Sequence, residues 1–320
     1  MSGTGNRNGA VTGTAGRGGL RGRFSRFRPR TRPRISGPSF NRLIPNILTL
    51  LGLCCGLTAI RFALDERWEQ AAVLIVVAGV IDGLDGRIAR LLKATSRFGA
   101  EFDSLSDFLC FGVAPALILY LWTLHDAPAW ARGWGFAPCI LFAVCSALRL
   151  ARFNASIAEA PAAVPIAGPP PKPAFAQSFF TGVPAPAGAG LAMFPIFAAL
   201  AFREWGWTGL EAAIRHPVFA ALLLVAVGAL MVSTLPTWSF KNFKVPEGVV
   251  LPLLLGIGAY VAVLLTEPWA ALAAAGLIYA GMLPLSVRSY ARLKREADAM
   301  LEPVVVADNT TPRPRPGDAA

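Results

Sequence analysis

Four aspartates lie close together in segments that are otherwise apolar, and their types and spacing suit chemistry at a shared site. Asp82 and Asp85 are three residues apart, and Asp103 and Asp107 are four apart, so each pair lies on one face of a helix. A charged side chain inside a membrane helix costs about 2.5–3.5 kcal/mol on insertion scales, so four unpaired carboxylates would cost on the order of 10 kcal/mol. The sequence therefore predicts a ligand that compensates their charge.

Hard divalent cations such as Mg²⁺, Mn²⁺ or Ca²⁺ are the ligands that a cluster of carboxylate oxygens suits. We expect two ions, because a pair about 3.5–4 Å apart forms a clamp for phosphoryl chemistry. Gly86 and Gly99 leave room for close approach of a nucleotide or of backbone, and Arg90 can pair with a phosphate or an aspartate. The alternative is that the acids pair with Arg87, Arg90 and Arg97, which set the membrane topology.

The composition shows what kind of element must position these residues. Of the 320 residues, 54% are hydrophobic and 15% are charged, whereas a soluble globular protein has roughly 45–50% apolar and about 25% charged residues. This excludes a water-soluble α/β enzyme, a disulfide-stapled secreted domain and a disordered chain. The five cysteines form no C-x-x-C pair, and the two histidines offer almost nothing for histidine-based catalysis.

The apolar residues form long blocks, most of them near the length of about 17–25 residues that a helix needs to cross a bilayer. We predict an all-α, polytopic membrane bundle of about eight transmembrane helices, at residues 43–64, 70–92, 102–124, 136–153, 187–202, 217–235, 248–266 and 269–287. The two helices with the aspartates are consecutive and joined by a short turn near Lys93–Arg97. We therefore expect them to be antiparallel neighbours whose carboxylates converge at the cytoplasmic end.

The distribution of lysine and arginine predicts the topology. Most basic residues fall on one side of the blocks, so both termini are expected in the cytoplasm, in a multi-pass protein of the cell membrane whose site faces the cytoplasm. The chain divides into a disordered Arg-rich tail at 1–42, a membrane domain at 43–287 and a cytoplasmic tail at 288–320. The Pro-rich connection 154–186 contains a partly ordered element around 179–181.

The net charge of +11 favours a partner that is negatively charged. We expect the Arg-rich tail to contact anionic lipid headgroups, because it is adjacent to a membrane span. An RNA-tethering anchor is the alternative, although no nucleic acid partner is expected. Small residues on several spans permit a homodimer.

One motif resembles the signature of a known family. The motif reads Asp82-x-x-Asp85-Gly86-x-x-Ala89-Arg90, then eight residues, then Gly99-x-x-x-Asp103-x-x-x-Asp107. It is similar, at every fixed position, to the signature of the CDP-alcohol phosphatidyltransferases. Further motifs resemble the phosphatidylserine synthase branch of that family, and they lie at Ile44-Pro45-Asn46 with Thr49, at 102–115, at 148–154 and at 179–184. The resemblance covers about residues 43–287.

The resemblance implies that the phosphatidyl group of CDP-diacylglycerol is transferred to an alcohol, with CMP as the other product. It implies that Asp82, Asp85 and Asp103 hold the metal ions, and that Asp107 joins the second ion and acts as the general base. The residues implied at the CDP moiety are Gly86, Arg90, Gly99, Asn46 and Thr49.

The branch-like motifs imply L-serine as the acceptor, with glycerol phosphate, an inositol phosphate or choline as alternatives. A serine carboxylate requires a cation, and the candidates are Arg149 or Arg152, with Asn154 nearby. Alternatively, these arginines only extend to the cytoplasmic surface. A metal-ion or proton transporter would also need membrane-embedded acids, but transporters usually place such sites near the bilayer midplane.

Overall fold

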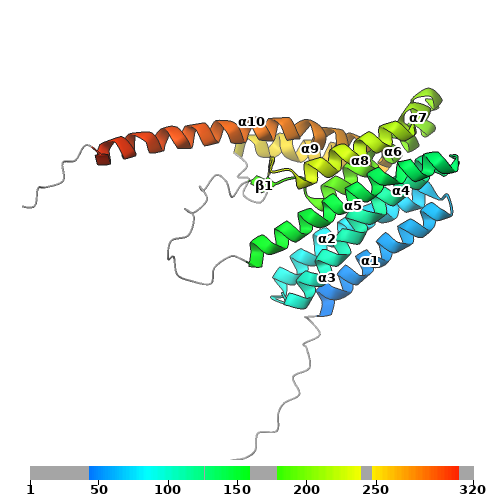
Figure 1. The fold of residues 1–320 in the computed structure, drawn as a ribbon, viewed down its shortest axis with the longest axis horizontal. Coiled ribbons are helices and arrows are strands. Elements are labelled where there is room, and N and C mark those ends of the chain that lie inside the picture. Colours follow the sequence, from blue (N-terminus) through cyan, green and yellow to red (C-terminus); the bar gives the residue numbers. More distant parts are fainter. Residues whose placement is uncertain (1–42, 126, 159–178, 239–246, 310–320) are drawn as a thin grey trace, which may run out of the picture. The chain divides into compact units, whose positions relative to one another are not determined.

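A computed structural model describes residues 43–125, 127–158, 179–238 and 247–309. The predicted Arg-rich tail at 1–42 and most of the Pro-rich connection lie outside these residues. The elements are α1 (Leu43–Leu64), α2 (Trp68–Leu91), α3 (Arg97–Asp107), the π-helical turn η2 (Phe108–Val113), α4 (Ala114–Leu124), α5 (Ala129–Ala158), β1 (Phe179–Thr181), α6 (Ala185–Glu204), α7 (Thr208–Ile214), α8 (Pro217–Val232), β2 (Pro236–Trp238), α9 (Glu247–Thr266) and α10 (Pro268–Asn309) (Figure 1).

The all-α class is confirmed, and each of the eight predicted spans coincides with helix. Within the described residues, six helices are long and apolar enough to cross a membrane, or seven if α7 and α8, which are bent by 53°, form one span. The protein is therefore a polytopic membrane protein. The helix α2 also has a sufficient length of 24 residues, but its second half carries four charged side chains. The number of eight crossing helices stays a prediction.

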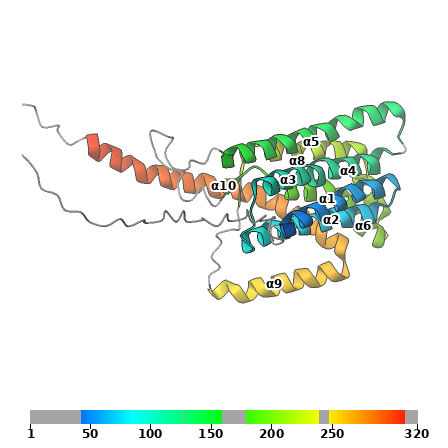
Figure 2. The same cartoon turned by 90° about the horizontal axis from the view of Figure 1, so that it is seen from below.

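Helix α6 lies at the centre of the apolar core. It is the most buried of the candidate spans, and it packs against α2, α4, α8 and α10. Alanine and glycine are frequent on it, and such small residues let neighbouring backbones come close within a bilayer. Helix α9, by contrast, has no buried residue in its apolar window, and Figure 2 shows it apart from α1, α2 and α6.

A pair of short strands joins the segments before α6 and after α8. Strands β1 and β2 are antiparallel, with Phe180 opposite Thr237. The Thr237 hydroxyl donates to the Gly182 carbonyl at 2.9 Å, and the Ser286 hydroxyl of α10 donates to the Pro236 carbonyl at 2.8 Å. The ordered element expected around 179–181 is thus a strand, β1, that pairs with β2, and β2 in turn is bonded to α10.

The C-terminal residues continue the last helix. Helix α10 runs without a break to Asn309, so it includes most of the segment from 288 that the sequence predicts as a cytoplasmic tail, and the cytoplasmic location of that segment stays a prediction. The segment after 288 is rich in Ala, Leu, Arg, Lys and Glu, which are strong helix formers. A helix can therefore extend beyond the apolar residues that would lie in lipid.

The turn between α2 and α3 is the short turn that the sequence predicts. Its backbone bonds run from Ala94 N–H to Ala89 carbonyl at 2.9 Å and from Lys93 N–H to Arg90 carbonyl at 3.2 Å, which is a Schellman motif. Lys93 has a φ of 49°, the left-handed conformation that this motif requires. The Ser96 hydroxyl then caps α3 by accepting from the Gly99 N–H at 3.0 Å. The turn therefore reverses the chain directly after the first aspartate pair.

The two aspartate-bearing segments share α1 as a packing partner. The second segment, predicted as the span 102–124, contacts α2 through η2 and α4, whereas α2 and α3 make few contacts with each other within the described residues. Helix α1 packs against both α2 and α3. Glycines of α1 allow this, because a Cβ at Gly56 would lie 2.6 Å from the Cys110 Sγ and 3.3 Å from the Cys110 Cα. A short connection brings two helices together, but side-chain size decides which faces touch, and here it favours α1 as the common partner.

We expect Gly56→Ala to lower the thermal unfolding temperature of the detergent-solubilised protein. The added methyl group must displace backbone as well as sulfur, and overpacking of this kind costs about 1–3 kcal/mol. The matched control is Gly256→Ala on α9, where a Cβ meets no atom within 4 Å, and its unfolding temperature should not fall. Equal stability of Gly56→Ala and the wild type would contradict close packing between α1 and η2.

Candidate active site

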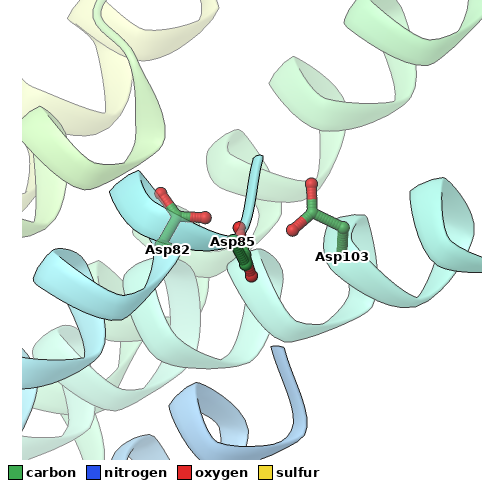
Figure 3. Close-up of side chains that lie close together, drawn as sticks. All are labelled: Asp82, Asp85 and Asp103. Carbon is green, nitrogen blue, oxygen red and sulfur yellow. The ribbon is translucent and has the colours of Figure 1, made fainter. Parts of the chain in front are cut away.

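The carboxylates of three aspartates come together between α2 and α3. One oxygen from each of Asp82, Asp85 and Asp103 lies within 4.8 Å of the others, and Figure 3 shows Asp85 between Asp82 and Asp103. The carboxyl group of Asp107 is in side-chain contact with that of Asp82. All four side chains line one small cavity that reaches from α1 to Phe111. The structure thus collects the acids from both helices in one place.

The spacing of these oxygens fits a hard divalent cation. Oxygen ligands lie about 2.0–2.6 Å from Mg²⁺ or Ca²⁺, so ligands on opposite sides of an ion are roughly 4–5 Å apart. The pairing with Arg87, Arg90 and Arg97 that the sequence left open is not seen. In the part of the chain that the structure describes, the ion pairs join Arg61 to Asp65 and His125 to Glu66. None of these ion pairs involves the four aspartates, so a bound cation could balance much of their charge.

Helix α1 completes the cluster with a threonine. The Thr49 hydroxyl donates to the Asp85 Oδ2 at 2.7 Å, and it also lies 3.1 Å from the Pro45 carbonyl oxygen of the preceding turn. The Ser106 hydroxyl of α3 reaches the Thr49 carbonyl at 3.4 Å. Asp85 is buried, with 4% of its surface exposed. These bonds orient a carboxylate that faces the other acids.

A π-helical turn follows immediately after Asp107. Residues Phe108–Val113 form η2, which the sequence analysis did not predict. Pro115 is the signal that was available, because it lacks the N–H that the Phe111 carbonyl would accept in an α-helix. Gly112 of this turn lies against α5, where a Cβ would be 2.7 Å from the Ser146 Oγ. Turns of this type are frequent at functional sites, and here the turn brings α5 close to the aspartates.

A larger pocket opens beside the carboxylates. It has a volume of about 180 Å³ and is lined by Pro45, Asn46, Thr49, Asp85, Gly86, Ala89, Ala94, Thr95, Ser96, Gly99, Ala100 and Asp103. A Cβ at Gly86 would meet no atom within 4 Å, whereas one at Gly99 would lie 2.9 Å from the Asn46 Oδ1. The absence of a side chain therefore widens the pocket at Gly86 and lets Asn46 approach at Gly99.

Arg90 stands outside the wall of this pocket. Its Nε donates to the Gly86 carbonyl at 3.1 Å, and this contact is exposed. The guanidinium is therefore attached to the rim, one helical turn after the glycine that opens the pocket.

The three residues on α5 that the sequence suggests for binding the serine carboxylate contact different parts of the structure. Arg152 donates from Nη1 to the Val232 carbonyl at 3.0 Å and from Nη2 to the Ser233 carbonyl at 3.2 Å, so it caps the end of α8. Asn154 donates from Nδ2 to the Ser104 hydroxyl at 3.0 Å, next to Asp103.

Arg149 is the candidate that faces the aspartates. Its guanidinium interacts electrostatically with Asp107, and its Nε is buried without a hydrogen-bond partner. The structure therefore brings Arg149 and Asn154 to the site and leaves Arg152 at α8. Two further residues, Ser104 and Tyr279, were not singled out from the sequence. The sequence feature that could have indicated Tyr279 is a hydroxyl group within an apolar span.

Curated relatives match most of the chain. The chain is 36% identical over 248 residues to the CDP-diacylglycerol–serine O-phosphatidyltransferase of Mycobacterium tuberculosis (strain H37Rv), which covers 78% of this chain and 79% of the relative. It is 32% identical to the protein of the same name from Mycobacterium leprae, over 85% of this chain and 82% of the relative. A 114-residue region is 44% identical to the Helicobacter pylori protein of that name, over 36% of this chain and 46% of the relative.

Family sequence models match both halves of the membrane region. The model described as CDP-alcohol phosphatidyltransferase matches residues 42–233, which include all four aspartates. A second, described as CDP-alcohol phosphatidyltransferase 2, matches residues 249–284. With the acidic cluster and the pocket that its signature residues line, these matches show that the chain is an enzyme of the CDP-alcohol phosphatidyltransferase family.

Proposed function

We propose that this chain transfers the phosphatidyl group of CDP-diacylglycerol to the hydroxyl group of L-serine, giving phosphatidylserine and CMP. The observation that carries the reaction is the convergence of Asp82, Asp85 and Asp103 within 4.8 Å beside an open pocket that Asp85 and Asp103 also line. Serine as the acceptor is supported by the relatives, whose names include serine and which align with this chain over about four-fifths of their own length.

The aspartates are proposed as ligands of two divalent cations, Mg²⁺ or Mn²⁺. Asp82, Asp85 and Asp103 hold one ion, and Asp107 contributes to the second. When bound, such ions neutralise a pyrophosphate and stabilise the leaving phosphate oxygen. The Thr49 hydroxyl holds the Asp85 carboxylate in place at 2.7 Å, so the oxygen set is oriented before a ligand arrives.

The CDP moiety is proposed to occupy the open pocket beside Asp85 and Asp103. Asn46, Thr49, Gly86 and Gly99 line it, and the missing side chain at Gly86 leaves space for a nucleotide beside Asp85. Arg90 on the rim is suited to a phosphate, because a guanidinium can donate two parallel hydrogen bonds to it.

Asp107 is proposed as the general base. As the serine oxygen forms its bond to the phosphorus of the phosphatidyl group, the bond to the CMP oxygen breaks and the hydroxyl proton passes to the Asp107 carboxylate. Arg149 is proposed to bind the serine carboxylate, since it interacts with Asp107 and its Nε has no partner. Arg152 is less suited, because both of its terminal nitrogens bond carbonyls of the α8 end.

The membrane arrangement of the proposed enzyme follows the sequence. We infer eight crossing helices in the cell membrane, with both termini and the mouth of the pocket in the cytoplasm, because lysines and arginines gather on that side. The Arg-rich segment 1–42 is proposed to contact anionic lipids, and small residues on the spans allow a homodimer.

Purified protein supplied with CDP-diacylglycerol and a divalent cation should release CMP when L-serine is added. Labelled L-serine should appear in the lipid product, while glycerol phosphate, inositol phosphate and choline should give at most a small fraction of that rate. If any of these three alcohols were incorporated into lipid faster than L-serine, that alcohol and not serine would be the acceptor. Transport of the cation without CMP release would argue against a transferase.

Asp107→Asn should lower CMP release by about 10²–10⁴-fold, the usual contribution of a general base. Excess Mn²⁺ should not restore the rate, because the amide cannot accept the proton. The matched control is Asp65→Asn, an exposed aspartate 3.7 Å from Arg61, which should keep wild-type turnover. Wild-type turnover by Asp107→Asn would remove this residue as the base.

Thr49→Val should raise the Mg²⁺ concentration needed for half-maximal activity by about 10–100-fold, the usual effect of losing a group that orients a metal ligand. The cause is the loss of its 2.7 Å bond to Asp85. Chelation should abolish CMP release in both proteins until the cation is restored. Thr58→Val is the control, since the Thr58 hydroxyl bonds only its own helix at the Cys54 carbonyl. An unchanged Mg²⁺ requirement in Thr49→Val would show that Thr49 does not act through the metal site.

A further inference from the structure

Buried side-chain polar atoms without a partner gather near the aspartates. In the described part of the chain these atoms are the Ser146 Oγ, the Arg149 Nε and the Tyr279 hydroxyl. Buried polar groups in proteins are almost always hydrogen-bonded, so such atoms indicate a place where a ligand supplies the missing partner. Ser146 and Arg149 are three residues apart on α5 and share a face.

Arg149 and Tyr279 are near each other in the structure although they are far apart in the sequence. They interact electrostatically across α5 and α10, and Arg149 also interacts with Asp107. A guanidinium has only donors, and a tyrosine hydroxyl has one donor. A group with two acceptor oxygens and a negative charge would satisfy both residues at once.

Phe111 connects this pair to the acidic cavity. Its side chain lines the cavity of the aspartates and also an apolar pocket of about 380 Å³, which Tyr279 lines from α10. The tyrosine ring therefore sits in an apolar wall, while its hydroxyl is buried close to Arg149. The hydroxyl is the polar end of a side chain that otherwise lines an apolar pocket.

We infer that the Tyr279 hydroxyl, together with Arg149, binds the carboxylate of the acceptor and makes the enzyme select an amino-acid alcohol. This inference rests on the proposed function. In L-serine the carboxylate and the hydroxyl are separated by two carbon atoms, so the groups that bind the carboxylate must lie near the base. Arg149 meets this condition because it interacts with Asp107, the proposed base. Tyr279 adds a second hydrogen-bond donor from α10, a helix that carries none of the four aspartates.

The test is Tyr279→Phe, which removes one hydroxyl and keeps the ring. The KM for L-serine should rise about 10-fold or more, as expected for a lost hydrogen bond to a charged group, while kcat and the KM for CDP-diacylglycerol stay within twofold. The control is Tyr260→Phe on α9, whose hydroxyl reaches the Ala271 carbonyl at 3.4 Å, and its kinetic constants should not change.

Two unreactive or truncated analogues separate recognition from structural damage. L-alanine lacks the hydroxyl of serine, so its inhibition constant should rise in Tyr279→Phe by the same factor as the serine KM. Ethanolamine lacks the carboxylate, so its inhibition constant should be unchanged. Equal increases for both analogues, or an unchanged serine KM in an active enzyme, would overturn the role of Tyr279. A wild-type protein without serine-dependent CMP release would overturn the proposed function itself and this inference with it.

Discussion

Mutual repulsion among four carboxylates is the constraint on which the rest of the structure depends. Removal from water and like charge both oppose an arrangement in which three of them lie within 4.8 Å. The neighbouring structure opposes their separation: α1 fits against η2 at Gly56, the Thr49 hydroxyl bonds Asp85, and the capped turn after α2 returns the chain to the site. A bound cation would relieve this repulsion, and a cation-dependent reaction therefore suits the cluster.

The two pockets next to the aspartate cluster match the polar nucleotide part and the apolar acyl part of the proposed lipid substrate. The pocket lined by α1, α2 and α3 is close to the carboxylates and suits a nucleotide. The second, between α2, α6 and α10, is apolar. Phe111 borders both the acidic cavity and the apolar pocket, so a single side chain separates polar chemistry from the hydrocarbon region. The π-helical turn that contains it begins directly after Asp107, which links the position of the proposed base to this boundary.

Much of the fold was predictable because the relevant signals are local. Each apolar block became helix, since a backbone in lipid must satisfy its own hydrogen bonds. The pairing of acids on one helix face followed from a period of 3.6 residues. The family resemblance pointed to Asn46 and Thr49, and both line the pocket. Hydrophobicity gave no indication that α10 extends beyond 288, because a helix needs no apolar surface where it leaves the lipid.

Composition, spacing and motif by themselves determined that this chain is a helical membrane protein with paired aspartates of the CDP-alcohol phosphatidyltransferase type. The tertiary structure decided which helices meet, because packing depends on the sizes of side chains that are distant in the sequence. It packed α1 against both aspartate-bearing helices, used Arg152 to cap α8, and left Arg149 facing Asp107 and Tyr279. Arg149 and Arg152 are three residues apart and have similar sequence surroundings. Only the residues that surround each of them in space give them different roles.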